Sequence, residues 1–395
     1  MSFTQRDDVI EEFLDYRSEE SREEILGKIE TLISDLMAGV ADTGLATMRL
    51  SNRRAAESIR FDKEKLHLTA RDAADTKQNI IAFPGPTILN SWRFAVLMRT
   101  LDIISESLTS GKVVTKRDIY YRETWLFKNQ AIVDRIVDDI GRTLNVPRAA
   151  LGIVAAQKGL ACGTFCIHKK DGALMAVEGE VQRMRCGVRW AILTARQIQL
   201  IPPFEEVKSV DVMDIDFVLV IEKEAIFRSL CSSKFYNRAD IGRSILVTGK
   251  GYPDLTTRQF ISNIATCHPD TPLFGAVDSD PYGIDILCTY KFGSRAMAHE
   301  NSHLTALNME WVGVNVLEYE DGWTKLSVGD RKKAIKMLSL PWMETEAAMA
   351  MRLELQRMLF LGQKAEMNVV GTEAYGVITY LTHAIKTRLD ALITH

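Results

Sequence analysis

The pattern of apolar and polar positions predicts a helical arm at the start of the chain. Residues 1–78 are mostly polar, and within them six apolar residues recur at helical spacing: Ile25, Ile29, Leu32, Ile33, Leu36 and Val40. Ser21 followed by Glu24 has the spacing of a capping box, which predicts that the helix begins there. The apolar stripe must pack either on this protein's own core or on a partner protein.

Three further helices are predicted in the stretch 79–172. The first covers residues 91–108 and ends at Gly111, and the second is a short helix capped by Thr115 with Asp118 three residues on. The third is amphipathic, follows Asn129 and stops before Pro147.

Strand-like residues 151–156 follow these helices, and Lys158-Gly159 then has the composition of a tight turn into a second strand. Three helices and a β wing predict a CAP-like winged helix-turn-helix. Such units dock a helix in the major groove of DNA, although many bind protein instead.

Residues 173–395 form the third predicted region. After strand-rich connecting structure up to about residue 210, four apolar runs alternate with helical stretches: DFVLVI, SILVT, LFGAV and WVGVNV. This alternation predicts a Rossmann-like parallel sheet covered on both faces, and two more helices are expected near the end of the chain. The fold class is therefore α/β and multi-domain, with divisions at 1–78, 79–172 and 173–395.

Carboxylates follow two of these predicted strands directly. Glu222 comes after FVLVI, and Asp278 and Asp280 come after LFGAV in a D-x-D pattern. The carboxyl ends of parallel strands share one edge of a sheet, so these acids should lie together. Their mutual repulsion would be relieved by a divalent cation, and an all-oxygen ligand set favours Mg²⁺ or Mn²⁺.

Bulk composition narrows the remaining choices. The net charge of −3 argues mildly against general nucleic-acid binding, so any contact with DNA requires local basic surface. Neither a span of bilayer length nor a signal-peptide core is evident. Six scattered cysteines without a C-x-x-C pair indicate buried thiols rather than the alternative of a zinc site around Cys162, Cys166 and His168.

The stretch TKRDIYYRE, residues 115–123, is the remaining chemical signal. A tyrosine hydroxyl can act as a covalent nucleophile, but it ordinarily keeps its proton at neutral pH and needs a nearby base or cation. Arg117 and Arg122 supply fixed positive charge here. From these residues alone, paired tyrosines are more often structural.

Five motifs occur in order: TKRDIYYRETWLFKNQ, RAALGIVAAQKGLACG, VLVIEKEAIF, TGKGYPDLTTRQF and VDSDPYGIDIL. Together they resemble the A subunit of DNA topoisomerase VI and its eukaryotic relatives, the meiotic double-strand-break proteins. The resemblance covers roughly residues 80–320. Because little is inserted between Tyr121 and WLFKNQ, the chain is more similar to the meiotic branch.

The resemblance implies a role for each matching residue. Tyr121, the last position of R-D-x-[Tyr/Phe]-Tyr, matches the nucleophile, with Arg117 beside it as a catalytic and DNA-binding residue. Three acids match the metal site of the Toprim domain: Glu222, Asp278 and Asp280. Lys158 and Tyr252, in the G-[Tyr/Phe]-P-D loop, match positions expected to face DNA.

The activity implied is a topoisomerase-like transesterification in the family of ATP-hydrolysing type II enzymes, with Mg²⁺ or Mn²⁺ assisting. It would leave a 5′-phosphotyrosine on DNA and begin meiotic recombination on chromosomes in the nucleus. The chain has no P-loop, so it is not expected to bind ATP in that way. The resemblance also implies a homodimer, a partner like the topoisomerase VI B subunit docking on the N-terminal helix, and meiotic accessory proteins.

Three rival functions stay open from the sequence. The chain could be an archaeal-type topoisomerase VI A subunit that reseals DNA with an ATPase partner. It could also be an inactive scaffolding relative, or a nuclease that cuts DNA with water and never becomes attached to it.

Overall fold

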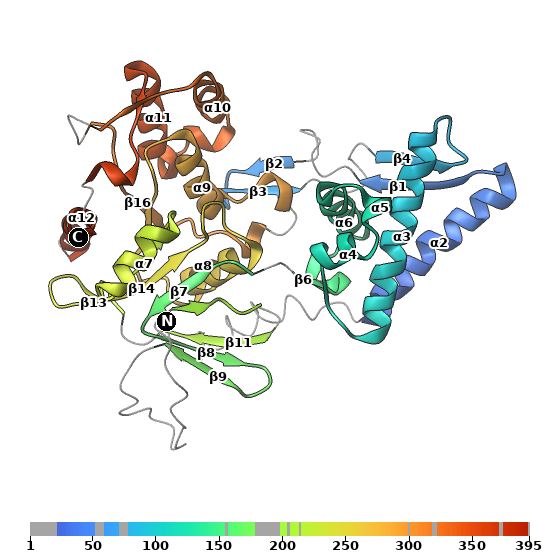
Figure 1. Cartoon of the computed structure of the whole chain (residues 1–395), viewed down its shortest axis with the longest axis horizontal. Coiled ribbons are helices and arrows are strands. Elements are labelled where there is room, and N and C mark those ends of the chain that lie inside the picture. The colour runs from blue at the N-terminus through green and yellow to red at the C-terminus, as the bar shows by residue number, and fades with distance from the viewer. Residues whose placement is uncertain are drawn as a thin grey trace. The chain divides into compact units, whose positions relative to one another are not determined.

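The chain folds into two units in a computed structural model that describes residues 22–51, 59–70, 78–154, 157–177, 198–203, 206–212, 215–298, 301–317, 322–370 and 374–393 (Figure 1). The first unit contains the described residues before residue 65, from 68 to 154 and from 294 to 302. The second contains most of the remainder, from residue 157 onward. None of the described helices is both long and apolar enough to span a bilayer.

Helices dominate the first unit. Its elements are α2 (Arg22–Thr43), β1 (Ala46–Ser51), β2 (Ile59–Asp62), β3 (His67–Ala70), β4 (Gln78–Phe83), α3 (Ile88–Ser110), β5 (Val114–Thr115), α4 (Lys116–Arg122), α5 (Thr124–Phe127), α6 (Gln130–Leu144) and β6 (Ile153–Val154). Strands β1 and β4 form an antiparallel pair that the sequence pattern did not predict.

The three helices predicted in this region are present, and local signals end them as expected. Helix α3 stops at Gly111, which adopts the left-handed conformation. Thr115 and Asp118 form the predicted capping box of α4. Asn129 caps α6, which ends at Asn145 before the proline.

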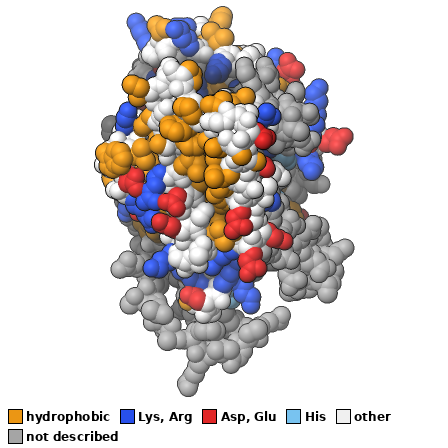
Figure 2. All heavy atoms as spheres, turned by 90° about the vertical axis from the view of Figure 1, so that its right-hand side faces the viewer, with side chains coloured by type: hydrophobic (Ala, Val, Ile, Leu, Met, Phe, Trp, Pro, Cys, Tyr) orange, Lys and Arg blue, Asp and Glu red, His pale blue; other side chains and the backbone are white. Residues whose placement is uncertain are grey.

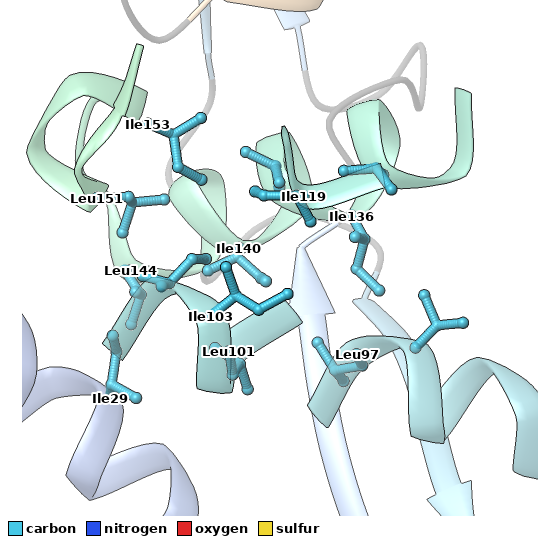
Figure 3. Packing of buried hydrophobic residues seen from close by; sticks show 14 of the residues in the cluster. Ile29, Leu97, Leu101, Ile103, Ile119, Ile136, Ile140, Leu144, Leu151 and Ile153 are labelled. Carbon is cyan, nitrogen blue, oxygen red and sulfur yellow. The ribbon is translucent and has the colours of Figure 1, made fainter. Parts of the chain in front are cut away.

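The apolar stripe of α2 packs on its own unit. Ile25, Ile29 and Leu36 are buried in a core shared with α3, α4 and α6, and Figure 3 shows side chains from these helices and β6 meeting there. Leu32 and Ile33 pack partly buried against the same core, so packing on the protein's own core is observed for these five stripe residues, whereas Val40 is exposed. Ser21 of the predicted capping box lies outside the described residues.

Hydrophobic side chains also gather on an exposed face that carries α2 and α3 (Figure 2). The exposed large apolar residues of these two helices and the adjoining strands are Met37, Val40, Leu45, Ile80, Phe83, Ile88 and Leu89.

The second unit is built on a mostly parallel sheet. Its strand order is β10-β7-β14-β12-β15-β16, from β10 (Gln199–Leu200), β7 (Leu160–Gly163), β14 (Gly242–Thr248), β12 (Phe217–Ile221), β15 (Leu273–Ala276) and β16 (Met309–Gly313). The four strands predicted from apolar runs, β12, β14, β15 and β16, pair in parallel, which confirms the expected sheet.

Helices pack against both faces of this sheet, as predicted. The principal helices of the unit are α7 (Glu224–Ser232), α8 (Leu255–Cys267), α9 (Pro281–Phe292), α10 (Val328–Leu338), α11 (Met349–Leu361) and α12 (Ala374–Ile393). Residues of α7 and α12 share one core with the alternate strand residues Phe217, Leu219 and Ile221. On α9, Leu287 closely approaches Gly275 of β15.

A smaller sheet and several short strands complete the second unit. The sheet has the order β11-β8-β9, from β11 (Val207–Asp211), β8 (Phe165–Lys169) and β9 (Leu174–Val177). The short strands are β13 (Asn237–Arg238), β17 (Thr324–Lys325) and β18 (Gln363–Lys364). Five cysteines in the described residues are buried free thiols, as expected, and Cys186 lies outside them.

The predicted wing differs from what is observed. Strand β6 is only two residues long and pairs in parallel with β5. The strand expected after Lys158-Gly159 is β7, which pairs with β14 in the large sheet instead of forming a hairpin with β6. All four residues of β7 are buried. Gly163 has a φ of +125°, and a Cβ there would lie 2.2 Å from the carbonyl oxygen of Ser244, so this strand fits closely against β14.

Candidate functional site

Tyr121 is an exposed residue of the first unit and lies on a short helix that is fixed at several points. Helix α4 is fixed at its start by the Thr115–Asp118 capping box and in its middle by Ile119, which is fully buried. The Tyr121 side chain is 67% exposed, whereas Tyr120 packs partly buried against the core. Their ring centroids lie 5.3 Å apart. Of the two tyrosines, Tyr121 is therefore the more accessible to a molecule in solution.

The basic residues around Tyr121 differ in whether an acidic side chain already pairs with their charge. Arg122 forms an ion pair with Glu106 at 2.9 Å. Lys116 is largely buried, donates to Asp138 at 2.5 Å, and has its pKa lowered by burial. Arg117 is exposed, and no ion pair or hydrogen bond is found for its side chain among the described residues. Since residues four apart share a helix face, Arg117 is the cation available beside Tyr121.

The three predicted acids lie at neighbouring strand ends of the second unit. Strands β12 and β15 pair in parallel, with Ile221 opposite Ala276, so the residues that follow them are adjacent. Glu222 Oε2 accepts a hydrogen bond from the backbone N–H of Asp278 at 3.0 Å. Asp280 begins α9, where its carboxylate accepts from the N–H groups of Tyr282 at 2.9 Å and Gly283 at 2.7 Å.

Burial and mutual repulsion dominate the electrostatics of this cluster. Burial, and then the negative charges of Asp278 and Asp280, raise the pKa of Glu222 to about 7. Burial also raises the pKa of Asp278, against the opposing effect of Lys223 and the Met367 N–H. Ionisation of both Glu222 and Asp278 is therefore unfavourable in this environment.

Two lysines provide positive charge among these acids. Lys223 Nζ lies 2.8 Å from Asp278 Oδ2 and 3.0 Å from Glu366, and these contacts raise its pKa despite burial. Lys364 Nζ lies 3.2 Å from Asp330 and 3.8 Å from Asp280 Oδ2. Sequence reasoning missed both lysines, although Lys223 directly follows Glu222.

The acid cluster fits a divalent cation in its chemistry but not as a ready-made cage. The donors are all oxygen. Burial and then mutual repulsion raise the pKa of Glu222, and a bound cation would oppose both effects. In the arrangement observed, however, no three Asp, Glu, His or Cys side chains of the described residues are close enough together to hold a metal. Asp278 and Asp280 are each engaged by a lysine and by backbone N–H groups, so these side chains would have to turn to bind one.

Lys158 and Tyr252 meet beside the same cluster. Lys158 Nζ donates to the carbonyl oxygen of Tyr252 at 2.6 Å, and its backbone N–H donates to Asp254 at 2.8 Å. The N–H of Gly251 donates to the carbonyl of Glu222 at 3.0 Å, which ties this loop to the acid site. The sequence pattern placed Lys158 in the wing of the unit that carries Tyr121, whereas the structure places it in the second unit, where β7 enters the sheet.

Tyr252 is held as a hydrogen-bond donor. Its hydroxyl donates to Asp285 Oδ2 at 2.6 Å, and Lys333 donates to the same oxygen at 2.6 Å. Burial and then Asp285 raise the pKa of Tyr252, which makes this hydroxyl harder to ionise. Neither Asp285 nor Lys333 was singled out from the sequence: Asp285 lies within VDSDPYGIDIL but outside its D-x-D pattern, and Lys333 lies outside all five motifs.

Comparison with known proteins gives the class of this chain. Residues 217–385 match the family model for the Toprim domain of topoisomerase 6 A-subunit/Spo11 proteins, and residues 92–153 match that of type IIB DNA topoisomerase.

Individual relatives agree. The chain is 32% identical over 358 residues to the meiotic recombination protein SPO11 of Homo sapiens, which covers 86% of this chain and 84% of that one. It is 34% identical over 319 residues to the meiotic recombination protein rec12 of Schizosaccharomyces pombe, with coverage of 78% and 83%. The A subunit of DNA topoisomerase 6 from Arabidopsis thaliana is 28% identical over 289 residues, with coverage of 73% and 61%. The chain belongs to the family formed by Spo11 and the topoisomerase VI A subunit.

The raised pKa of Glu222 predicts a pH dependence of stability in the absence of divalent metal. Because its folded-state pKa of about 7 is above the ordinary value of 4.5, the stabilisation is complete below about pH 4.5 and is lost as the pH rises toward 7. In denaturant titrations with EDTA, Glu222→Gln should flatten the fall in unfolding free energy across this window.

Glu224→Gln is the matched control. The pKa of Glu224 is lowered by Arg228, so its contribution is lost in the opposite direction, as the pH falls. Parallel pH profiles for wild type and Glu222→Gln would contradict the assignment.

Proposed function

We propose that this protein is a topoisomerase-like DNA transesterase that makes the double-strand breaks initiating meiotic recombination. The observation that supports this best is the exposed Tyr121 on a capped helix beside Arg117, for which the described part of the chain shows no ion pair, in a chain that also carries acids at strand ends of its Toprim domain. The meiotic assignment is favoured over an archaeal-type relaxing enzyme because matches named meiotic recombination proteins reach 35% identity, against 28% for those named topoisomerase 6 subunits.

The proposed reaction exchanges one phosphodiester for another. The Tyr121 oxygen attacks phosphorus in line and loses its proton, the P–O3′ bond breaks, and the 3′ oxygen takes up a proton. The enzyme stays attached to the 5′ phosphate. No bond energy is lost overall, so no nucleotide hydrolysis is required for the chemical step. Any ATP hydrolysis belongs to a partner protein.

Positioning and charge neutralisation are the main tasks of the protein in such a reaction. Arg117 stabilises negative charge on the phosphate in the transition state. Glu222, Asp278 and Asp280 are the residues proposed to hold Mg²⁺ or Mn²⁺, which would stabilise charge on the leaving oxygen and orient the DNA. Lys223 must release Asp278 when a cation takes its place. Lys158 and Tyr252 are proposed to contact the DNA backbone.

Two copies of the chain are required to cut two strands, so the active form is proposed to be a homodimer on nuclear chromosomes. Meiotic accessory proteins and a partner related to the topoisomerase VI B subunit are also proposed. Because Ile25, Ile29 and Leu36 pack inside the first unit, the partner is proposed to contact Met37 and Val40, the exposed large apolar residues of this helix.

Covalent attachment tests the central claim. Tyr121→Phe removes one exposed oxygen and should abolish the DNA-linked protein recovered from cells in meiosis, while leaving the melting temperature nearly unchanged. Tyr120→Phe is the matched control and should keep most activity. Breaks without attached protein would indicate hydrolysis by water instead, and loss of activity only in Tyr120→Phe would reverse the assignment.

The role of Arg117 can be separated from general DNA affinity. Arg117→Ala should lower cleavage by about tenfold or more, as the loss of a transition-state donor does, with a smaller loss of binding to the same duplex. Arg122→Ala removes an equal charge that is already paired with Glu106, and it should have little effect on cleavage. Equal losses of binding and cleavage in Arg117→Ala would restrict this residue to docking.

Variants on two faces of α2 can distinguish residues that bind the proposed partner from residues that stabilise the core. Met37→Glu combined with Val40→Glu should leave the melting temperature nearly unchanged and prevent co-purification with a co-expressed B-like partner. Ile29→Glu buries a charge in the core and should unfold the first unit. Normal co-purification of the double variant would place the partner elsewhere.

A further inference from the structure

A fully buried serine connects the two aspartates of the acid cluster. Ser279 lies between Asp278 and Asp280 and has no exposed surface. Its carbonyl accepts from the N–H of Ala365 at 3.0 Å, and the neighbouring Asp278 Oδ1 accepts from the N–H of Met367 at 2.8 Å. The loop that carries both acids is therefore fixed from the side by a segment far along the chain.

The Ser279 side chain is anchored by a buried carboxylate. Ser279 Oγ donates to Glu354 Oε1 at 2.5 Å, and the N–H of Val316 donates to the same oxygen at 2.6 Å. Arg357 Nη1 lies 3.4 Å from Glu354 Oε2. Glu354 therefore joins three segments at one point: the loop after β15, the loop after β16, and helix α11.

Helix α11 is held firmly enough to act as this anchor. It packs against α9, where Met351 Sδ lies 3.6 Å from Cys288 Sγ, and Leu355 and Met358 beside Glu354 are fully buried. Removing a carboxylate from water is costly, and an apolar residue in the interior of a helix avoids that cost. Glu354 has no exposed surface, so its compensation comes from the bonds to Ser279, Val316 and Arg357. An apolar side chain could fill the same space but could not orient Ser279.

We propose that Glu354 is a positioning residue for the metal site, which acts through Ser279 to set where Asp278 and Asp280 point. This inference rests on the proposed function, since it assumes that the acid cluster binds a divalent cation. Glu354 itself is not a ligand in this proposal, because its two oxygens are already engaged by Ser279, Val316 and Arg357. Residues that orient metal ligands in this way typically change metal affinity by about ten- to a hundredfold.

Calorimetric titration of the full chain with MgCl₂ and with MnCl₂ tests the proposal without DNA. Glu354→Ala should weaken cation binding by about tenfold or more. Ser279→Ala removes the hydroxyl group and should have a similar effect, and the double variant should be no weaker than either single one, because both act through the same contact. Glu354→Gln keeps the size and one acceptor oxygen, so it should recover part of the affinity and supplies a folded variant if Glu354→Ala is unstable.

Ile167→Ala is the control for general destabilisation. Ile167 is buried in β8 of the smaller sheet, so this variant should lower the melting temperature and keep the affinity. An equal loss of affinity in Ile167→Ala would overturn the proposal, as would independent, multiplying effects of Ser279→Ala and Glu354→Ala. Wild-type affinity in all Glu354 and Ser279 variants would also overturn this inference. The metal site of the proposed function would not be contradicted by that result. If wild type and Asp278→Asn both failed to bind either ion, the metal site of the proposed function would fall first, and this inference with it.

Discussion

Three carboxylates lie close together at the ends of two parallel strands, and several other groups of the second unit compensate their negative charge. Parallel pairing of β12 and β15 makes Glu222 and Asp278 neighbours whether or not their charges are compensated. Compensation comes from Lys223 and Lys364, from the backbone N–H groups that reach Asp278 and Asp280, and from the raised pKa of Glu222. A protein that only needed stability could replace these acids by apolar residues. The divalent cation proposed for this site would offset their cost.

Tyr121, the proposed nucleophile, depends on a different kind of support. Helix α4 has only seven residues, too few to be stable alone, and it persists because of its capping box and the buried Ile119. Tyr120 adds its ring to the core, which leaves Tyr121 free to project. One face of the helix thus fixes it to the core, and the other face exposes Tyr121. In the acid cluster, by contrast, the carboxylates are largely buried, and segments distant in the chain fix the loop that carries them.

How much of the structure could be predicted from the sequence depends on how far apart along the chain the interacting residues lie. Helix caps such as Thr115 and Asn129, and the apolar runs of β12, β14 and β15, are local, so they were found. The adjacency of Glu222 and Asp278 follows from a general property of parallel sheets. The place of β7 could not be read locally, because LACG suits a wing or a sheet interior equally and its pairing strand, β14, lies far along the chain. Glu354 looks like an ordinary polar position in LELQRM, and only the tertiary structure shows that it is buried.

The tight fit of Gly163 against Ser244 has a consequence for the interpretation of natural sequence variants. A side chain at position 163 would meet the backbone of the neighbouring strand, and the backbone conformation there is one that other residues rarely adopt. Such a variant would remove the protein by misfolding, whereas loss of Tyr121, the proposed nucleophile, would leave a folded chain. The first lesion would be accompanied by low protein abundance, and the second would not. Genetic data on this chain can therefore separate chemistry from folding only when protein levels are measured as well.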